Sequence, residues 1–228
     1  MPTQNLTWVT DPPVVQLTDF TQVRMAADRI EDAVNDATQI VGGTEGKGLI
    51  SLDDSQRYSD ICEDMRQLAL DEKKRVDFEF YCYYVTGIPL VLMSTYCPKF
   101  PRLNDGRMSI LPKPGLWVEG TVGSPYASGS GILMKEFAVN LSQSKGYNGR
   151  VGCAAASAEA EKTWCQMGFR KTGKKYTEKS GGKEHEYPVL FLDPVEIPQY
   201  WALMNGRWSF KPKPFTLSGP PHQDSPPQ

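Results

Sequence analysis

The chain has 228 residues, enough for one substantial hydrophobic core, and this length favours a single domain with short appendages. Its 25 Lys and Arg residues nearly balance 27 Asp and Glu residues, and the formal net charge of −2 argues against nucleic acid or an anionic membrane as a partner. Five widely spaced cysteines and only two histidines favour reduced, buried thiols and argue against a metal site.

The sequence also predicts a cytoplasmic protein without a membrane span. The N-terminus lacks the basic start and apolar stretch of a signal peptide. The most apolar region, residues 81–97, is interrupted by Thr86-Gly87 and Pro89 and is rich in Tyr. We therefore interpret it as two strands.

The N-terminal part of the chain predicts a strand followed by two helices. Residues 14–17 form a short apolar strand candidate. Apolar residues then recur three and four apart over residues 20–37, which places one apolar stripe along a helix. A second helix is expected after a cap at residues 53–55, and the charged run 71–75 is its solvated end.

A β-hairpin should follow. Residues 78–85 and 89–96 are rich in β-branched and aromatic side chains, and Thr86-Gly87 between them has turn chemistry. The Pro- and Arg-rich stretch after it contains a possible extra strand at residues 108–111. The Gly-rich segment 42–48 lacks a preceding strand and the Gly-Lys-Ser/Thr ending of a phosphate loop, so we interpret it as a flexible loop.

The middle of the chain carries the most informative pattern. It predicts a strand (116–122), a Gly-rich turn (125–131), a helix (132–145), a strand of small residues (150–155) and a helix capped by Ser157 that ends at Gly168. A strand that runs into a Gly-x-Gly turn and then a helix leaves backbone N–H groups free where the helix dipole favours an anion. Such turns are common, so the turn alone is a weak prediction of a phosphate site.

The C-terminal part predicts more β structure. Residues 170–186 alternate Lys, Gly and Glu and suggest an exposed hairpin loop that leads to an apolar strand at 189–192. Beyond it, aromatic residues flank Asn205-Gly206, a dipeptide that favours a tight hairpin, although a short helix fits the same residues.

These patterns divide the chain into a domain at 1–193, an aromatic C-terminal extension at 194–217 and a Pro-rich tail at 218–228, expected to be disordered in isolation. The extension either packs on its own domain or, with the tail, offers a protein partner a surface over residues 200–228.

The turn and the helix ending resemble the GNAT acyltransferases, the family related to Gcn5. The family pattern is a strand, Gln/Arg-x-x-Gly-x-Gly/Ala opening a helix, another strand, and a helix ending in Tyr-x-x-x-Gly-Phe. In this chain residues 126–131 occupy the turn and residues 164–169 the helix ending, with Tyr126 in place of Gln or Arg and Trp164 in place of Tyr. The order of elements also matches over residues 14–192.

The resemblance implies an α+β fold in which a central mixed sheet, with helices on both faces, opens between its fourth and fifth strands. It implies that acetyl-CoA lies in this opening and that an amine of a small molecule, or a lysine or N-terminus of a protein, attacks the thioester directly. The residues implied to bind the acyl donor, along the fourth strand, at the turn and at the helix ending, are Val118, Gly120, Val122, Ser128, Gly129, Ser130, Gly131, Ile132 and Trp164.

The catalytic residues are less clearly marked. Glu119, on the strand implied to line the opening, is the candidate base, and Glu79 is the next choice; the alternative for both is an outward-facing strand carboxylate. An indole N–H cannot act as a proton donor, so Tyr126 or a water would have to replace the acid at the position of Trp164. No His lies near Cys153 or Cys165, which favours a core role for both thiols.

Two classes of function remain open. The first is an acetyl-CoA-dependent N-acetyltransferase, either metabolic or a toxin that modifies a protein. The second is a catalytically inactive GNAT-fold protein that serves as a structural or interaction component of a larger assembly, for example a phage particle. Trp164 and the aromatic extension favour the second, and binding of acetyl-CoA would discriminate between them.

Overall fold

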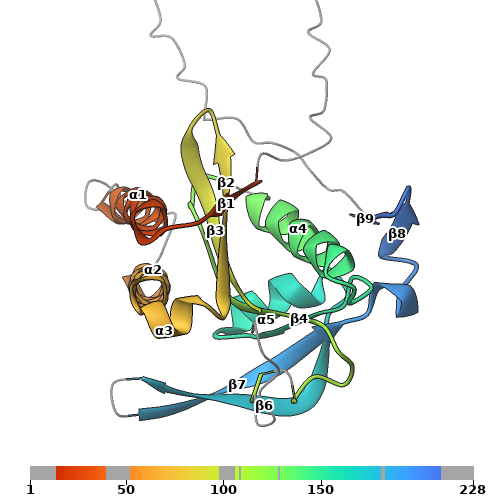
Figure 1. The fold of residues 1–228 in the computed structure, drawn as a ribbon. Coiled ribbons are helices and arrows are strands. Elements are labelled where there is room, and N and C mark those ends of the chain that lie inside the picture. The colour runs from red at the N-terminus through yellow and green to blue at the C-terminus, as the bar shows by residue number, and fades with distance from the viewer. Residues whose placement is uncertain are drawn as a thin grey trace, which may run out of the picture.

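A computed structural model describes residues 14–39, 52–97, 106–107, 109–127, 129–180 and 183–211. In these ranges a seven-stranded mixed sheet has the order β1-β2-β3-β4-β5-β7-β6, and helices cover both of its faces (Figure 1). A separate two-stranded sheet follows near the C-terminus. The predicted α+β fold with a central mixed sheet is confirmed.

The first four strands form an antiparallel meander. β1 (Val14–Leu17) pairs with β2 (Phe78–Val85), β2 pairs with β3 (Ile88–Tyr96), and β3 pairs with β4 (Leu116–Gly123). Thr86 and Gly87 join β2 to β3 with φ angles of 49° and 81°. Positive φ at both central residues is the geometry of a tight hairpin turn, so the predicted hairpin is confirmed.

Helices α1 (Phe20–Gln39) and α2 (Leu52–Leu70) cover one face of the meander. The predicted stripe of α1 is buried, and Ile30 has no exposed surface. Arg66 of α2 ties the two helices together through a 3.0 Å hydrogen bond to Asp28. The charged run that we expected at the end of α2 instead forms a one-turn helix of its own, α3 (Glu72–Arg75).

The opposite face carries α4 (Ser130–Ser144) and α5 (Ala158–Cys165), which flank the short strand β5 (Val151–Ala154). The predicted cap of α5 is confirmed, because the Ser157 hydroxyl accepts a 3.0 Å hydrogen bond from the Ala160 N–H. The hydrophobic core on this face joins residues of both helices to the sheet.

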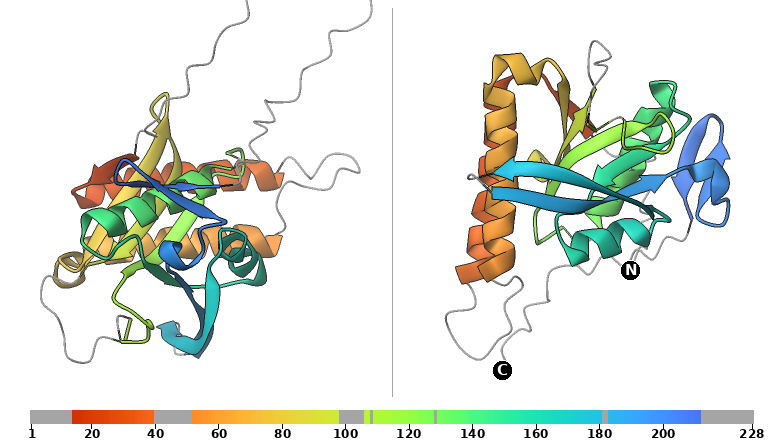
Figure 2. Two further views of the ribbon diagram at one scale, coloured as in Figure 1. Left: turned by 90° about the vertical axis from the view of Figure 1, so that its right-hand side faces the viewer. Right: turned by 90° about the horizontal axis from the view of Figure 1, so that it is seen from below.

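Strands β6 (Arg170–Ser180) and β7 (Lys183–Leu192) correct two sequence predictions. The segment that we expected to be an exposed hairpin loop is a long, regular antiparallel hairpin that reaches across to the α2 side of the molecule (Figure 2). Its alternating charges pair across the strands, as in the 2.5 Å contact between Lys175 and Glu186. Residues 109–111, predicted as part of an extra strand, form none; Leu111 is buried beside Trp117 instead.

The C-terminal extension begins with the short helix η2 (Pro194–Glu196) and continues as a hairpin of β8 (Trp201–Met204) and β9 (Arg207–Phe210). Asn205 and Gly206 have φ angles of 52° and 78°, which confirms the hairpin over the short helix.

This hairpin packs on α4 of its own chain. Trp201, Trp208 and Phe210 are buried in the same core as α4. Asn140 of α4 accepts a 2.8 Å hydrogen bond from the Trp208 N–H and donates a 2.9 Å bond to the Trp208 carbonyl. Three large aromatic side chains are thus used within the domain.

Other sequence predictions fall outside the described residues: the loop at 42–48, the stretch 98–105 and the tail at 218–228. All five cysteines are described, and all are free thiols, as predicted. Within the described ranges, no helix is both long and apolar enough to span a bilayer.

Candidate functional site

The sheet opens between β4 and β5, where the sequence motifs led us to expect an opening. The two strands pair in parallel only over Leu116–Val118 and Val151–Cys153, although β4 continues to Gly123. The cause lies on the other side of β4. Ser94 of β3 pairs with Gly120 and Thr95 pairs with Val118, so Glu119 is an extra residue in a β-bulge. A bulge bends its strand and re-aims side chains, and here it turns β4 away from β5.

A cleft of about 890 Å³ lies beside this opening. Its walls come from α2, β4, α5 and the β6–β7 hairpin, and its size is in the range of small-molecule sites. Aromatic side chains form much of the lining; they are Phe78, Tyr96, Trp117, Trp164, Tyr176 and Tyr187.

Glu119 lies in this cleft and is firmly held. The Arg107 Nε donates a 2.6 Å hydrogen bond to its Oε2, the Arg107 Nη2 donates to its Oε1, and the Trp117 Nε1 donates a 2.7 Å bond to Oε2. Arg107 in turn lies 4.9 Å from the ring centroid of Tyr96 and 5.4 Å from that of Tyr176. The result is an oriented carboxylate on a scaffold of aromatic rings.

The Gly-rich turn before α4 uses part of its own hydrogen-bonding capacity. The Ser130 N–H donates to the Ala127 carbonyl at 3.1 Å and the Ile132 N–H to the Gly129 carbonyl at 3.0 Å. The Ser130 hydroxyl also donates to the Ala127 carbonyl, at 2.6 Å. In this conformation these three donors are not free to bind a phosphate. The turn therefore offers fewer free hydrogen-bond donors than the motif implies. A Cβ at Gly131 would meet no atom within 4 Å, so the start of the helix is open on that side.

The structure brings together some of the predicted residues and separates others. Val118, Glu119, Gly120 and Trp164 line the cleft. Val122 does not, because it is buried in the core against α1 and α2. Ser128 lies outside the described residues.

The two other proton-transfer candidates do not line the cleft. Tyr126 is 52% exposed on the turn. Glu79 accepts hydrogen bonds from the Tyr81 hydroxyl and the Lys145 ammonium, both at 2.8 Å. Neither position supports a direct contact with a substrate in the cleft.

Lys135 is a feature that the sequence prediction missed. It projects from α4 with only 7% exposure, donates a 2.9 Å hydrogen bond to the Thr163 hydroxyl and lies 4.5 Å from the ring centroid of Trp164. Burial lowers the pKa of this ammonium to about 8. Its spacing from Ala138 and Ser142 puts it on the buried stripe of the helix, and this signal could have been read from the sequence.

The cysteines behave as core residues. Burial raises the pKa of Cys62 and of Cys82 to about 12, and it also raises the pKa of Cys153, whose residue lines the cleft. A thiol with a raised pKa stays protonated near neutral pH and is a poor nucleophile.

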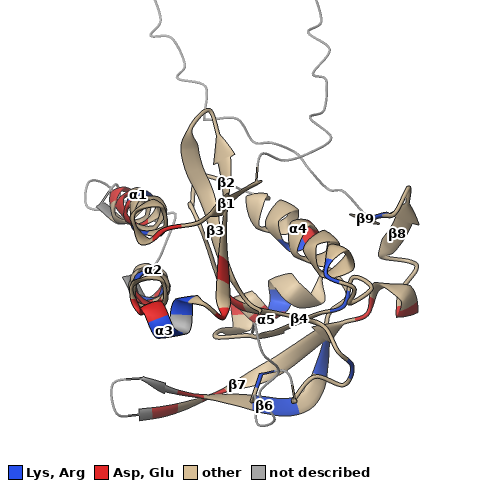
Figure 3. Ribbon diagram, viewed as in Figure 1, with Lys and Arg blue, Asp and Glu red and all other residues tan. Residues whose placement is uncertain are grey.

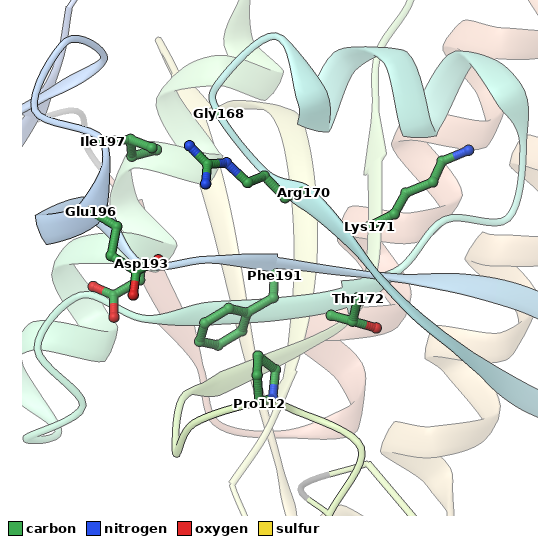
Figure 4. Close-up of a pocket in the computed structure, with 9 residues that line it drawn as sticks. All are labelled: Pro112, Gly168, Arg170, Lys171, Thr172, Phe191, Asp193, Glu196 and Ile197. Atoms are coloured by element: carbon green, nitrogen blue, oxygen red, sulfur yellow. The ribbon is translucent and has the colours of Figure 1, made fainter.

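A second pocket, of about 120 Å³, lies where β6 begins, β7 ends and η2 follows (Figure 4). Asp193 and Glu196 at its edge are both paired with Lys113, at 2.9 and 2.5 Å. This pocket is too small for a typical ligand site. Among the residues that the structure describes, no group of three or more His, Cys, Asp or Glu side chains could hold a metal ion.

The open mixed sheet with helices on both faces defines a class of fold that is also found in solved structures. No protein-family model and no curated protein matches the chain. A GCN5-related N-acetyltransferase of Rhodopseudomonas palustris matches with a TM-score of 0.50 and 11% identity, over 80% of this chain and 95% of that one. The chain therefore has the GNAT fold.

Two further matches have lower scores. An N-acetyltransferase of Staphylococcus aureus Mu50 has a TM-score of 0.46 and 11% identity, over 80% of this chain and 97% of that one. The PaiA N-acetyltransferase of Thermoplasma acidophilum, solved in complex with coenzyme A, has a TM-score of 0.43 and 7% identity, over 78% and 97%.

Proposed function

We propose that the protein is a cytoplasmic N-acetyltransferase that uses acetyl-CoA as acyl donor and an amine as acceptor. The observation that carries this proposal is the bulge at Glu119, which opens the sheet and places a carboxylate at the side of the opening. The five free thiols, three of them buried, are in keeping with a reducing compartment.

The acyl donor would supply an activated thioester at the opening between β4 and β5. Val118 and Gly120 line this region and would flank its pantetheine arm. The exposed side of Gly131 and the start of α4 would meet its phosphates, with the helix dipole favouring the negative charge. Because the Ser130 and Ile132 N–H groups already have acceptors, tight binding would require the turn to rearrange or to rely on its remaining donors.

In the reaction, the acceptor nitrogen would form an amide bond to the acyl carbon while the carbon–sulfur bond breaks. The nitrogen would give up a proton and the departing thiolate would take one. Glu119, oriented by Arg107 and Trp117, is our candidate to accept the first proton, directly or through a water.

Lys135 is our candidate to supply the second proton. It is a buried ammonium that does not itself line the cleft but lies 4.5 Å from the ring centroid of Trp164, which does, so a water or a movement of the side chain would have to carry the proton to the thiolate. Its pKa of about 8 suits proton donation near neutral pH. Tyr126, the acid considered from the sequence, stays a prediction.

Titration of the full chain with acetyl-CoA tests donor binding. We expect binding below millimolar concentration, and we expect Gly131→Trp to abolish it, because the added ring would occupy the open side of the helix start without a clash in the fold. Absence of binding at millimolar ligand would contradict the proposal.

Amine-dependent release of coenzyme A thiol then tests turnover. Glu119→Gln should lower kcat by about 100-fold or more, the usual size of a general-base effect, and leave acetyl-CoA binding unchanged.

The second candidate function, a GNAT-fold interaction protein without activity, is favoured by two observations. The Ser130 and Ile132 N–H groups at the Gly-rich turn are already hydrogen-bonded within the chain, and Lys135 lies against Trp164 between α4 and α5. The aromatic extension supports it less than its sequence suggested, because Trp201, Trp208 and Phe210 are buried on their own domain. Leu203 and Met204 of β8 are exposed and would be the described part of a partner surface within 200–228.

A further inference from the structure

Two carboxylates without partners lie on opposite walls of the cleft. Asp64 comes from α2 and Glu178 from β6, and both line the cleft. Within the described part of the chain neither side chain makes an ion pair or a hydrogen bond. They are nevertheless close enough to interact, because burial and then the charges of Asp64 and Glu119 raise the pKa of Glu178.

The surroundings of Asp64 are also acidic. Its pKa is raised by partial burial and by the carboxylates of Asp60, Glu63 and Glu119. Asp64 is solvent-accessible and also lines the cleft. Asp64 and Glu178 thus carry negative charge in an acidic neighbourhood without an ion pair of their own in the described part of the chain. Arg107, paired with Glu119, and His185 offset this charge only in part at Glu178, so a cation from outside would be stabilised there.

The described lining of the cleft as a whole also carries an excess of negative charge. Among the described residues that line the cleft, five are acidic (Asp60, Asp64, Asp77, Glu119 and Glu178) and three are basic (Arg57, Lys73 and Arg107). Arg57 lies 3.2 Å from Asp54 and Arg107 is paired with Glu119, while Lys73 is an exposed side chain of α3. Figure 3 shows acidic positions on both the α2 and the β6–β7 sides. The excess favours entry of a cation.

An independent observation marks the floor of the cleft as a polar binding position. The Ser94 hydroxyl is fully buried, has no hydrogen-bond partner and lies in the lining. It points at Gly120, since a Cβ built there would be 3.3 Å from the Ser94 Oγ. A buried hydroxyl without a partner is unfavourable, so a polar atom of a ligand or a water that reached this hydroxyl would be stabilised by it.

From this arrangement we propose that the cleft binds an elongated amine with at least two ammonium groups, a linear diamine or polyamine. One nitrogen lies on the floor near Ser94 and Glu119, and a second binds between Asp64 and Glu178. Aromatic rings such as Tyr176 and Tyr187 also line the cleft and suit a methylene chain. The assignment of this amine as acyl acceptor rests on the proposed function; its binding does not.

Calorimetric titration of the full chain without acyl donor tests the proposal. The probes are 1,4-diaminobutane, 1,5-diaminopentane and 1,6-diaminohexane, each compared with the monoamine of the same length. We expect at least one diamine to bind ten or more times as tightly as its monoamine, and this preference to weaken at high salt. Equal affinity of every diamine and its monoamine would overturn the proposal, as would binding of a lysine-containing peptide but of no diamine.

Paired variants localise the second ammonium. Asp64→Asn combined with Glu178→Gln should weaken diamine binding at least tenfold and bring it close to the binding of the monoamine. The matched control is Asp32→Asn combined with Asp36→Asn, which removes the same charge at exposed positions on α1 that do not line the cleft. A similar loss in both double variants would overturn the assignment, because it would reflect net charge alone. Thermal unfolding confirms that each variant is folded.

The outcomes separate this proposal from the proposed function. Diamine binding without acetyl-CoA binding would support the cation site and contradict the acetyltransferase. Acetyl-CoA binding and amine-dependent thiol release without a diamine preference would support the enzyme and overturn the diamine site.

Discussion

Lys135 is the residue at which stability and the proposed chemistry conflict most directly. Its pKa is lowered by burial from the ordinary 10.5 to about 8, so the unfolded chain binds this proton more tightly than the folded protein does. Between these two values the unfolded state therefore carries more protons, and the free energy of unfolding rises with pH. Below pH 8 the full cost of burying the ammonium is present.

We predict that Lys135→Met stabilises the protein at pH 7 by roughly 2 kcal/mol, since a shift of this size corresponds to about 3 kcal/mol and the lost bond to Thr163 offsets part of it. Urea unfolding measured from pH 7 to pH 10 checks this. The gain should be nearly constant up to about pH 8 and shrink above it, as wild type loses its penalty. A constant difference between wild type and variant would contradict the prediction, and if Lys135 is the proton donor, the same variant should lose turnover.

The ion pair of Arg107 and Glu119 gives a second prediction at this scale. Arg107→Met leaves the Glu119 carboxylate, which is only 13% exposed, without its counter-ion, and we expect a loss of about 1–3 kcal/mol of unfolding free energy. Glu119→Gln should cost less, because the amide still accepts from Trp117 and Arg107 keeps its aromatic contacts. Urea unfolding compares them, with Lys175→Met at the exposed pair with Glu186 as control. Equal losses of unfolding free energy at Arg107 and Lys175 would contradict the prediction that burial makes the pair of Arg107 and Glu119 the stronger one.

These residues also show how far the sequence could predict the site. Glu119 could be placed in the cleft because strand, turn and helix follow one another in the sequence and fix its neighbourhood. Arg107 could not, because it comes from a Pro-rich stretch without periodicity and reaches Glu119 only through tertiary packing. Asp64 and Glu178 each look like ordinary solvated charges, and only the fold brings α2 and β6 to the same cleft.

At the scale of elements, Gly168 lies just after α5 and packs against the C-terminal extension. Its φ is +92°, and a Cβ there would lie 2.4 Å from Ile197 Cδ1 and 3.3 Å from the Tyr200 ring. We predict that Gly168→Ala destabilises the protein by about 2 kcal/mol or more, from backbone strain together with displacement of the extension. Thermal unfolding, with tryptophan fluorescence as a second signal for Trp201, measures the effect.

Gly173 provides the control for this prediction. Its φ is +78°, but a Cβ there would meet nothing within 4 Å, so Gly173→Ala carries the strain without the clash. If both variants lose the same stability, contact with the extension contributes nothing and the prediction is wrong.

The elements that were predicted correctly are those whose signals are local. The α1 stripe and the Thr86-Gly87 and Asn205-Gly206 turns each depend on a few neighbouring residues. The extent of the β6–β7 hairpin was missed because its charged, Gly-containing sequence lacks an apolar face, and it is held by cross-strand pairs. The bulge at Glu119 was also missed, since register is a property of two strands and not of one.

At the scale of the whole molecule, the sheet consists of two halves that meet only over the first three residues of β4 and β5. The meander β1–β4 with α1 and α2 forms one half, and β5, β7 and β6 with α5 belong to the other. A ligand in the opening would contact both. It would then stabilise the whole domain by mass action, by about 2.7 kcal/mol at a concentration 100 times its Kd.

We therefore predict that saturating acetyl-CoA raises the Tm and slows amide hydrogen exchange next to the opening, at residues 119–123 of β4 and at the start of α4, while β1 at the far edge of the sheet changes little. Hydrogen exchange followed by mass spectrometry, with and without 1 mM acetyl-CoA, measures this pattern. Gly131→Trp should show the exchange of the unliganded wild type under both conditions. Protection confined to the exposed β6–β7 hairpin, or spread evenly over the chain, would place the ligand elsewhere and would count against the opening as the donor site.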